Sequence, residues 1–173
     1  MTEEIIYRKM TEKDIPLLTT WLQTPLVYEF FNGVPSSCEE VHNKYLPRIQ
    51  GKHPVKPYIF SYKGNPAGYL QKYKIESRAA SEWGYAEEDT IYGMDCFIGD
   101  PDIFNQGVGT RMVRGFVNHI LHSDSPSYIV LDPAKKNKRA IRCYEKAGFK
   151  IIREISDGSS LLMELEEIGR AHV

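Results

Sequence analysis

Apolar residues recur along this chain with two different periods, which predict a mixture of short strands and amphipathic helices. Side chains alternate between the two faces of a strand, whereas residues three or four apart share one face of a helix. The period of two, bounded by turn residues, predicts strands at residues 5–10, 58–62, 68–75, 91–98, 128–131, 149–155 and 161–166. The helical period predicts helices at residues 11–22, 37–50, 109–122 and 138–147. A polar stretch, residues 76–90, precedes the strand at 91–98.

Local start and turn signals support these elements. Thr11 is followed three residues later by Asp14, and Ser37 by Glu40, which is the pattern of a capping box at a helix N-terminus. The polar turn at residues 63–66 predicts a hairpin between two strands. The clearest helix has six apolar residues at core-facing spacing: Val108, Met112, Val113, Phe116, Val117 and Ile120. This order of strands and helices, with a strand–helix crossover in the middle, predicts an α/β or α+β domain of three layers.

Composition narrows the class of protein. With 173 residues, 42% of them apolar and 26% charged, the chain is long enough for one soluble, globular domain. The net charge of −1, without a basic stripe, argues against a nucleic-acid binder. The sequence has no apolar run long enough to span a membrane, and we expect neither a signal peptide nor a membrane partner.

Cysteine and histidine spacing argues against metal or disulfide chemistry. Cys38, Cys96 and Cys143 are odd in number and scattered, with no Cys-x-x-Cys pair. The five histidines lack the spacing of metal ligands. We therefore expect no metal, no disulfide framework and a reducing, cytoplasmic location.

The run Asn105-Gln106-Gly107-Val108-Gly109-Thr110 is the most informative local sequence. It joins a predicted strand to the start of the central helix. Glycines at such a turn let backbone N–H groups converge at the positive end of the helix dipole, which suits a phosphate. The same pattern also occurs in ordinary strand–helix turns, so by itself it leaves both interpretations open.

Charge is divided unevenly along the chain. Residues 76–102 contain eight acids and one base, whereas residues 135–153 contain eight bases and one acid. Two solvated faces would explain this pattern. A basic side for a polyanionic cofactor and an acidic side for a cationic substrate would explain it too.

Taken together, these motifs resemble the GNAT acyltransferase superfamily, and within it the bacterial aminoglycoside 6′-N-acetyltransferases. The resemblance extends from about Tyr7 to Met163. Its more specific motifs are Tyr92-Gly93-Met94-Asp95, Leu131-Asp132-Pro133 and the run from Arg139 through Phe149. It implies a GNAT fold, with a central mixed, mostly antiparallel sheet flanked by helices and with splayed central strands. It also implies acetyl transfer from acetyl-CoA to the 6′-amine of an aminoglycoside, with coenzyme A as product, by direct attack in a ternary complex.

The resemblance assigns roles to individual residues. Asp95 matches a carboxylate that removes a proton from the amine, and Tyr144 matches a phenol that protonates the departing thiolate. Backbone N–H groups near Cys96 and Phe97, on a bulged strand, match the donors to the thioester oxygen. Residues implied to bind the cofactor are Cys96, Phe97, Ile98, Gln106, Gly107, Val108, Gly109, Thr110, Asn137, Ala140 and Tyr144. Residues implied to bind the substrate are Gln71, Tyr73, Trp83, Glu88, Asp89, Asp95 and Asp132.

Each of these residues also has a purely structural interpretation. Asp95 could pair with a lysine or end the strand, and Tyr144 could pack in the buried stripe of its helix. Asp132 could be a turn residue before Pro133, and Asn137 is a natural helix N-cap. In the loop, Phe104 stands where the superfamily has Gln or Arg.

Two alternative functions and the domain limits complete the sequence-based expectations. The fold could serve a siderophore precursor or a polyamine as acceptor, or it could bind acetyl-CoA without catalysis. We expect a single domain over residues 1–168, followed by a disordered end or cloning remnant at 169–173. We expect a polycationic small molecule as partner, and the protein to be a monomer or a homodimer.

Overall fold

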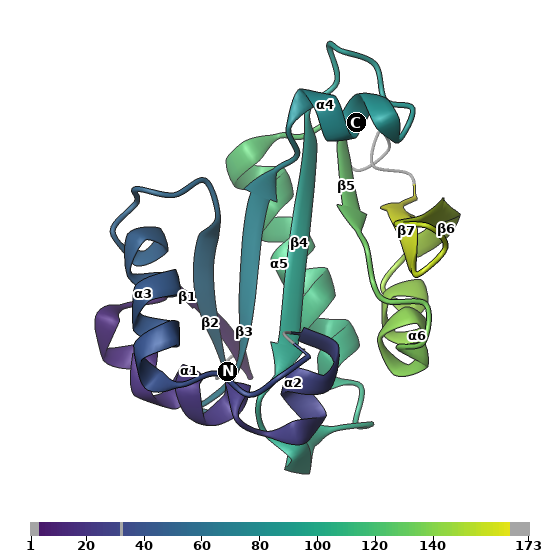
Figure 1. The fold of residues 1–173 in the computed structure, drawn as a ribbon. Helices are drawn as coiled ribbons and strands as arrows, with labels where there is room; N and C mark the ends of the chain where they lie inside the picture. Colours follow the sequence, from purple (N-terminus) through teal and green to yellow (C-terminus); the bar gives the residue numbers. More distant parts are fainter. Residues whose placement is uncertain (1–3, 32, 167–173) are drawn as a thin grey trace. The chain divides into compact units, whose positions relative to one another are not determined.

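The computed structural model describes residues 4–31 and 33–166, in which helices and strands follow one another in mixed order (Figure 1). The strands are β1 (Ile5–Lys9), β2 (Lys56–Tyr62), β3 (Asn65–Lys74), β4 (Ile91–Ile98), β5 (Tyr128–Leu131), β6 (Phe149–Ile155) and β7 (Ser160–Leu165). The α-helices are α1 (Ile15–Leu22), α2 (Pro25–Phe31), α3 (Cys38–Ile49), α4 (Ser77–Glu82), α5 (Val108–Asp124) and α6 (Lys138–Lys146). Two short 3₁₀ turns, η1 (Glu12–Asp14) and η2 (Pro101–Ile103), complete the described elements.

A seven-stranded sheet has the order β1-β2-β3-β4-β5-β7-β6. The pairs β1–β2, β5–β7 and β6–β7 are antiparallel, whereas β4 and β5 are parallel, as a strand–helix–strand crossover through α5 requires. Within the described residues, the register of the parallel pair joins Ile91–Gly93 to residues 128–130 and extends no further along β4. The predicted mixed, mostly antiparallel sheet with flanking helices is confirmed.

The chain divides into two compact units. Among the described residues, unit 1 comprises those up to Gln71 together with Asp95–Gly109, and unit 2 comprises Lys72–Met94 together with the residues from Thr110 onward. The prediction of one domain over residues 1–168 stays a prediction. The predicted tail, residues 169–173, lies outside the described residues.

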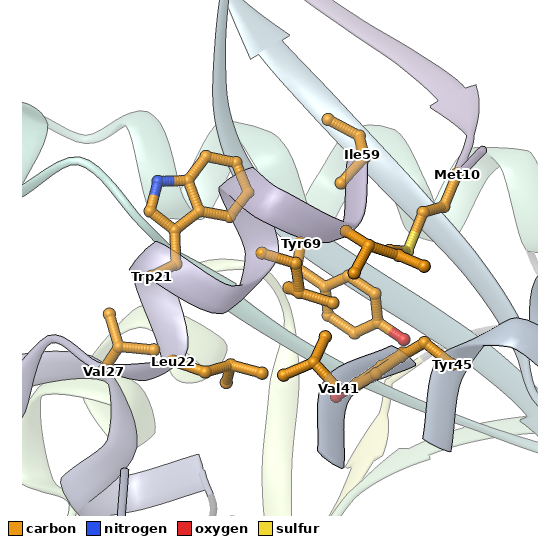
Figure 2. Close-up of a cluster of buried hydrophobic side chains, with 10 residues drawn as sticks. Met10, Trp21, Leu22, Val27, Val41, Tyr45, Ile59 and Tyr69 are labelled. Atoms are coloured by element: carbon orange, nitrogen blue, oxygen red, sulfur yellow. The ribbon is translucent and has the colours of Figure 1, made fainter. Parts of the chain in front are cut away.

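Unit 1 has a core built from α1, α3 and two strands (Figure 2). Trp21 and Leu22 of α1, Val41 and Tyr45 of α3, and Tyr69 of β3 are at most 6% exposed. In Figure 2 the Tyr45 and Tyr69 rings lie close together, and their centroids are 5.6 Å apart at an edge-on angle of 85°. Such edge-to-face pairs stabilise a core beyond the burial of their surface.

One cluster of buried residues lies within unit 2. Ala80 of α4, Ile91 of β4, Val130 of β5 and Leu162 of β7 are buried together. The partly buried Trp83 packs against this cluster. The hydroxyl of Tyr85 donates a hydrogen bond of 2.7 Å to Glu164, and the rings of Tyr85 and Tyr128 lie 5.0 Å apart. The polar stretch before β4 is therefore anchored to the sheet of unit 2.

Both capping boxes form as predicted. Ser37 accepts a hydrogen bond from the Glu40 amide at 3.1 Å, and the Glu40 side chain accepts one from the Ser37 amide at 3.0 Å. At the first helix, the Asp14 carboxylate accepts a 2.8 Å bond from the amide of Thr11. Backbone amides at the start of a helix have no hydrogen-bond partner within the helix, and the capping side chains accept hydrogen bonds from them.

The largest differences from the sequence-based predictions concern α2, α4 and the start of β3. Helix α2 forms over residues 25–31, where the sequence predicted no helix. Pro25 suits the first position of a helix, and Val27 is the residue of α2 that is buried. Helix α4 forms inside the polar stretch. Strand β3 begins at Asn65, three residues earlier than predicted, because Lys63 and Gly64 alone form the turn, with φ of 50° and 84°. Two consecutive residues with positive φ are typical of the tightest hairpin turns.

An ion pair near the chain start makes stability depend on pH. Two guanidinium nitrogens of Arg8 donate to the two carboxylate oxygens of Asp14 at 2.8 Å each. Burial opposes the charged form of Asp14, but the hydrogen bonds from Arg8 and Thr11 outweigh burial and lower the pKa of Asp14 below its ordinary value. A lowered pKa in the folded state stabilises the fold above the unfolded pKa of about 3.9, and this stabilisation is lost as the pH falls through the folded pKa.

We therefore expect Asp14→Asn to lower the free energy of unfolding at pH 7 by about 1–2 kcal/mol, since a charge-assisted hydrogen-bond pair and a cap are both weakened. The difference between the wild type and the variant should shrink as the pH falls below about 4, because the carboxyl of the unfolded chain then takes up a proton before that of the folded chain, whose pKa is lower. Urea denaturation at pH 7 and pH 3 measures both values. A difference that stays constant between the two pH values would contradict this role of Asp14.

Candidate active site

Asp95 lies in the middle of β4, partly buried, with a polar neighbour on β3. The side-chain amide of Gln71 donates a hydrogen bond from Nε2 to Oδ2 of Asp95 at 2.7 Å. Gln71 is 8% exposed, so this contact is largely shielded from water. A carboxylate inside an apolar strand is costly without such a partner. The structure thus brings two of the predicted site residues of unit 1 into direct contact.

Two further donors converge on the other end of the Gln71 amide. The hydroxyl of Tyr69 donates to Oε1 at 2.7 Å, and Nη1 of Arg48, on α3, donates to the same oxygen at 3.0 Å. Tyr69 is fully buried, and burial raises its pKa well above the ordinary value, so the phenol keeps its proton. A chain of hydrogen bonds therefore leads from α3 and β3 to Asp95.

Helix α3 also places positive charge near Asp95. Burial lowers the pKa of Lys44 and the charge of Arg48 lowers it further, whereas Asp95 acts in the opposite direction. The Lys44 ammonium and the Arg48 guanidinium lie 5.6 Å and 5.2 Å from the centroid of the Tyr45 ring. Burial raises the pKa of Tyr45 to about 12. The surroundings of Asp95 therefore contain cations that favour its charged form.

The glycine-containing loop leads directly into α5. Asn105 and Gly107 have φ of 61° and 78°, and a side chain at Gly107 would meet nothing within 4 Å. The side-chain amide of Gln106 donates to the carbonyl of Asp102 at 2.7 Å, which ties the loop to η2. Helix α5 begins at Val108, one residue earlier than predicted. The open space at Gly107 beside a helix N-terminus fits the approach of a phosphate to backbone N–H groups.

Helix α6 of unit 2 contains the predicted phenol and its N-cap. Tyr144 is 8% exposed, and its ring lies 6.5 Å from that of Phe149. The side chain of Asn137 accepts a hydrogen bond from the amide of Ala140 at 3.3 Å, which confirms the predicted cap. The hydroxyl of Thr110, in the first turn of α5, donates to the sulfur of Cys143 at 3.8 Å. The structure thus brings α6 and the start of α5 together within unit 2.

The predicted substrate residues of unit 2 come from three segments. Tyr73 on β3 packs over Gly93, where an added Cβ would lie 2.7 Å from its ring. Asp89 is partly buried and accepts a hydrogen bond of 3.3 Å from the amide of Ala86, whereas Glu88 and Asp132 are exposed. These contacts hold the loop before β4 while leaving acidic side chains at the surface.

Cys96, Phe97 and Ile98 continue β4 beyond Asp95 and are all partly buried. The ring of Phe97 stacks on Tyr69 at 5.6 Å and lies edge-on to Trp21 at 6.1 Å. This packing fixes the backbone whose N–H groups are the predicted donors to the thioester oxygen. The bulge expected in this strand stays a prediction.

Residues 4–31 and 33–166 contain no group of three or more His, Cys, Asp or Glu side chains that could hold a metal ion. Within the same residues, no helix is both long and apolar enough to cross a membrane.

Three residues near Asp95 were not among the site residues predicted from the sequence: Arg48, Tyr69 and Lys44. Tyr69 and Gln71 are two apart on one strand and so share a face, which is a signal that a sequence contains. Arg48 lies 23 residues from Gln71 along the chain, and no local pattern indicates that pairing.

A family described as an acetyltransferase (GNAT) domain matches residues 10–157. The chain belongs to the GNAT acetyltransferase family. This GNAT acetyltransferase is 32% identical over 150 residues to an aminoglycoside N(6')-acetyltransferase type 1 of Klebsiella pneumoniae, and the match covers 86% of this chain and 75% of that protein.

Solved structures give the same picture for this GNAT acetyltransferase. It is 31% identical to AAC(6')-Ib in a complex with ribostamycin and coenzyme A, with a TM-score of 0.82 and coverage of 97% of both chains. It is also 31% identical to AAC(6')-Ib in a complex with coenzyme A and kanamycin, with a TM-score of 0.80 and coverage of 98% of this chain and 99% of that one. The predicted GNAT fold is therefore confirmed.

Proposed function

We propose that this GNAT acetyltransferase transfers the acetyl group of acetyl-CoA to the 6′-amine of aminoglycoside antibiotics and so gives resistance. The observation that carries the proposal is its similarity, along nearly the whole of both chains, to AAC(6')-Ib, which has been seen with coenzyme A and kanamycin. In this proposal the protein acts in the cytoplasm, and its partner is a polycationic small molecule.

Asp95 accepts a proton from the substrate amine in this proposal. A sugar ammonium group must lose a proton before its nitrogen can attack the thioester carbonyl. The neutral nitrogen attacks the carbonyl carbon, which forms the C–N bond and an oxyanion. Collapse of the oxyanion breaks the C–S bond, and the nitrogen loses its second proton to water, which leaves an acetamide and a thiolate. General-base assistance of this kind contributes about 10²–10⁴ in rate. The hydrogen bond from Gln71 and the nearby cations of α3 favour the carboxylate form of Asp95, which is the form that can take a proton.

Backbone and phenol groups complete the proposed chemistry. Backbone N–H groups near Cys96 and Phe97 donate to the oxyanion that forms on the thioester carbonyl. Tyr144 then donates its phenolic proton to the departing thiolate, coenzyme A leaves as the thiol, and the phenolate takes a proton back from water. Ile98 extends the strand along the acyl donor. The packing of Phe97 against Tyr69 and Trp21 supports this role, because it restrains the backbone before the substrates bind.

Binding of acetyl-CoA is assigned to the loop and to α6. Acetyl-CoA supplies the activated acetyl group of the reaction. Backbone N–H groups of Gln106, Gly107, Val108, Gly109 and Thr110 bind its pyrophosphate, and Asn137 and Ala140 bind further along the molecule. The positive φ and open space at Gly107 support this assignment, since a phosphate needs close approach to the backbone.

The aminoglycoside is assigned to acidic and aromatic side chains. Glu88, Asp89 and Asp132 provide negative charge for its ammonium groups, and Tyr73 and Trp83 provide ring surfaces. The exposure of Glu88 and Asp132 supports this assignment, because both carboxylates are accessible to a cationic ligand. Charge attraction of this kind raises the rate of encounter by about 10–10³ and weakens with added salt.

Thiol release from acetyl-CoA, measured with a panel of amines, tests the proposal. We expect kanamycin and ribostamycin to react with a kcat/KM at least about tenfold above that of simple diamines, because more ammonium groups meet the acidic side chains. A preference for diamines or a hydroxylysine-type amine would contradict the aminoglycoside as acceptor, whereas acetyl transfer from acetyl-CoA to an amine would still hold. Binding of coenzyme A without thiol release for any amine would contradict catalysis.

A further inference from the structure

We propose that Gln71 is a positioning residue for Asp95, and that Arg48 and Tyr69 hold its amide in the orientation which this task needs. The inference rests on the proposed role of Asp95 as the acceptor of the amine proton. It differs from the sequence-based prediction for Gln71, which was direct contact with the substrate.

The donors around Gln71 determine which end of its amide faces Asp95. An amide oxygen and nitrogen look alike in shape, so their assignment depends on the hydrogen-bond partners. The Arg48 guanidinium has donors and no acceptor, so the atom 3.0 Å from its Nη1 must be the amide oxygen. The amide nitrogen therefore faces Oδ2 of Asp95, at 2.7 Å.

Tyr69 reinforces this orientation. Its hydroxyl donates to the same amide oxygen at 2.7 Å, inside a core where Tyr69 is fully buried. Because burial raises the pKa of Tyr69 well above the ordinary value, the hydroxyl stays a donor over the working pH range. Turning the amide over would place its N–H groups against two donors, which a buried site does not tolerate.

The consequence for Asp95 is a fixed position and a preference for the charged form. A hydrogen bond donated to a carboxylate favours its ionised state. A proton on Oδ2 would meet the N–H of Gln71, so the amide disfavours that site of protonation. The charged groups that act on Asp95 from the neighbouring elements are Lys44 and Arg48 on α3. Tyr45 on α3 and Tyr69 on β3 are titratable, but burial raises the pKa of both, so they stay neutral and exert no net charge on Asp95.

Gln71→Met tests the inference, because methionine keeps the length of the side chain but removes the donor and the acceptor. We expect kcat/KM to fall by about tenfold, mainly through kcat, as one charge-assisted hydrogen bond is lost. The acidic limb of the pH–rate profile should move to higher pH, since Asp95 loses a donor that favours its charge. Tyr69→Phe leaves Arg48 in place, so it should produce a smaller change in the same direction.

Tyr45→Phe is the matched control. Its hydroxyl is buried beside Tyr69 and has no hydrogen-bond partner among the described residues. Its removal should leave kcat/KM and the pH profile unchanged. A loss of activity as large as that of Tyr69→Phe would overturn the specific role of the Tyr69–Gln71 contact.

A second measurement separates this inference from the proposed function. Carbon NMR of the Asp95 carboxyl follows its titration whether or not an aminoglycoside is the substrate. Asp95 should titrate at higher pH in Gln71→Met than in the wild type. An unchanged titration overturns the inference, and so does a raised KM with an unmoved pH profile, which would indicate direct substrate contact. An inactive wild type with the expected change in titration would contradict the proposed function alone.

Discussion

Asp95→Asn is expected to lower kcat/KM for aminoglycoside acetylation by about 100-fold or more, because a neutral amide cannot accept the amine proton. Asparagine has almost the same shape as aspartate, and its oxygen can still accept the hydrogen bond from Gln71. Stability and coenzyme A binding should therefore change little. Thiol release from acetyl-CoA with kanamycin, together with calorimetric titration of coenzyme A, measures both effects.

Asp157→Asn provides the matched control for this experiment. Asp157 is exposed in the turn between β6 and β7, and its φ of 56° is a conformation that asparagine also adopts readily. This variant should keep the wild-type kcat/KM. An Asp95→Asn enzyme that works at the wild-type rate would remove Asp95 from proton transfer.

Lys72→Met is expected to lower the free energy of unfolding by about 2–3 kcal/mol, because it leaves the partly buried carboxylate of Asp124 without its cation. Lys72 is 6% exposed, and its ammonium group donates to Oδ2 of Asp124 at 2.7 Å. The same group lies 3.0 Å from the hydroxyl of Ser123 and 3.1 Å from Nε2 of His119. Methionine fills the space but satisfies none of these groups. Urea denaturation at pH 7 measures the loss.

Lys74→Met controls for the removal of a charge from the same strand. Lys74 is two residues further along β3 and exposed, so its replacement should change stability by less than about 0.5 kcal/mol. Combining Lys72→Met with Asp124→Asn should recover part of the loss, because the unpaired carboxylate is then removed as well. Equal stability of Lys72→Met and Lys74→Met would show that the buried ion pair contributes nothing.

Several elements were predictable because their signals are local. The limits of β4, β5 and β6 coincide with their predicted ranges, and α6 ends one residue before its prediction. Alternating burial, capping side chains and glycines act within a few residues, so they can be recognised in a sequence. Helices α2 and α4 were missed because they have seven and six residues, too few for an apolar stripe to repeat.

The candidate site residues also fall into two groups, those with a local sequence signal and those whose partners are distant in the sequence. The acid in mid-strand at Asp95, the glycines at 107 and 109 and the cap at Asn137 stand out from their immediate neighbours. The pairing of Gln71 with Asp95 joins residues 24 apart, and that of Lys72 with Asp124 joins residues 52 apart. Consecutive strand residues point to opposite faces, so Gln71 and Lys72 contact different partners. The alternation along the strand does not indicate which distant residue each of them meets.

The sequence by itself determined the order and kind of the elements, the acid on β4 and the turn that begins α5, since each depends on interactions within a few residues. Only the tertiary structure decided that Arg48 and Tyr69 orient the Gln71 amide toward Asp95. Hydrogen bonds between distant segments depend on how strands and helices pack, and packing geometry is not contained in any local pattern of residues.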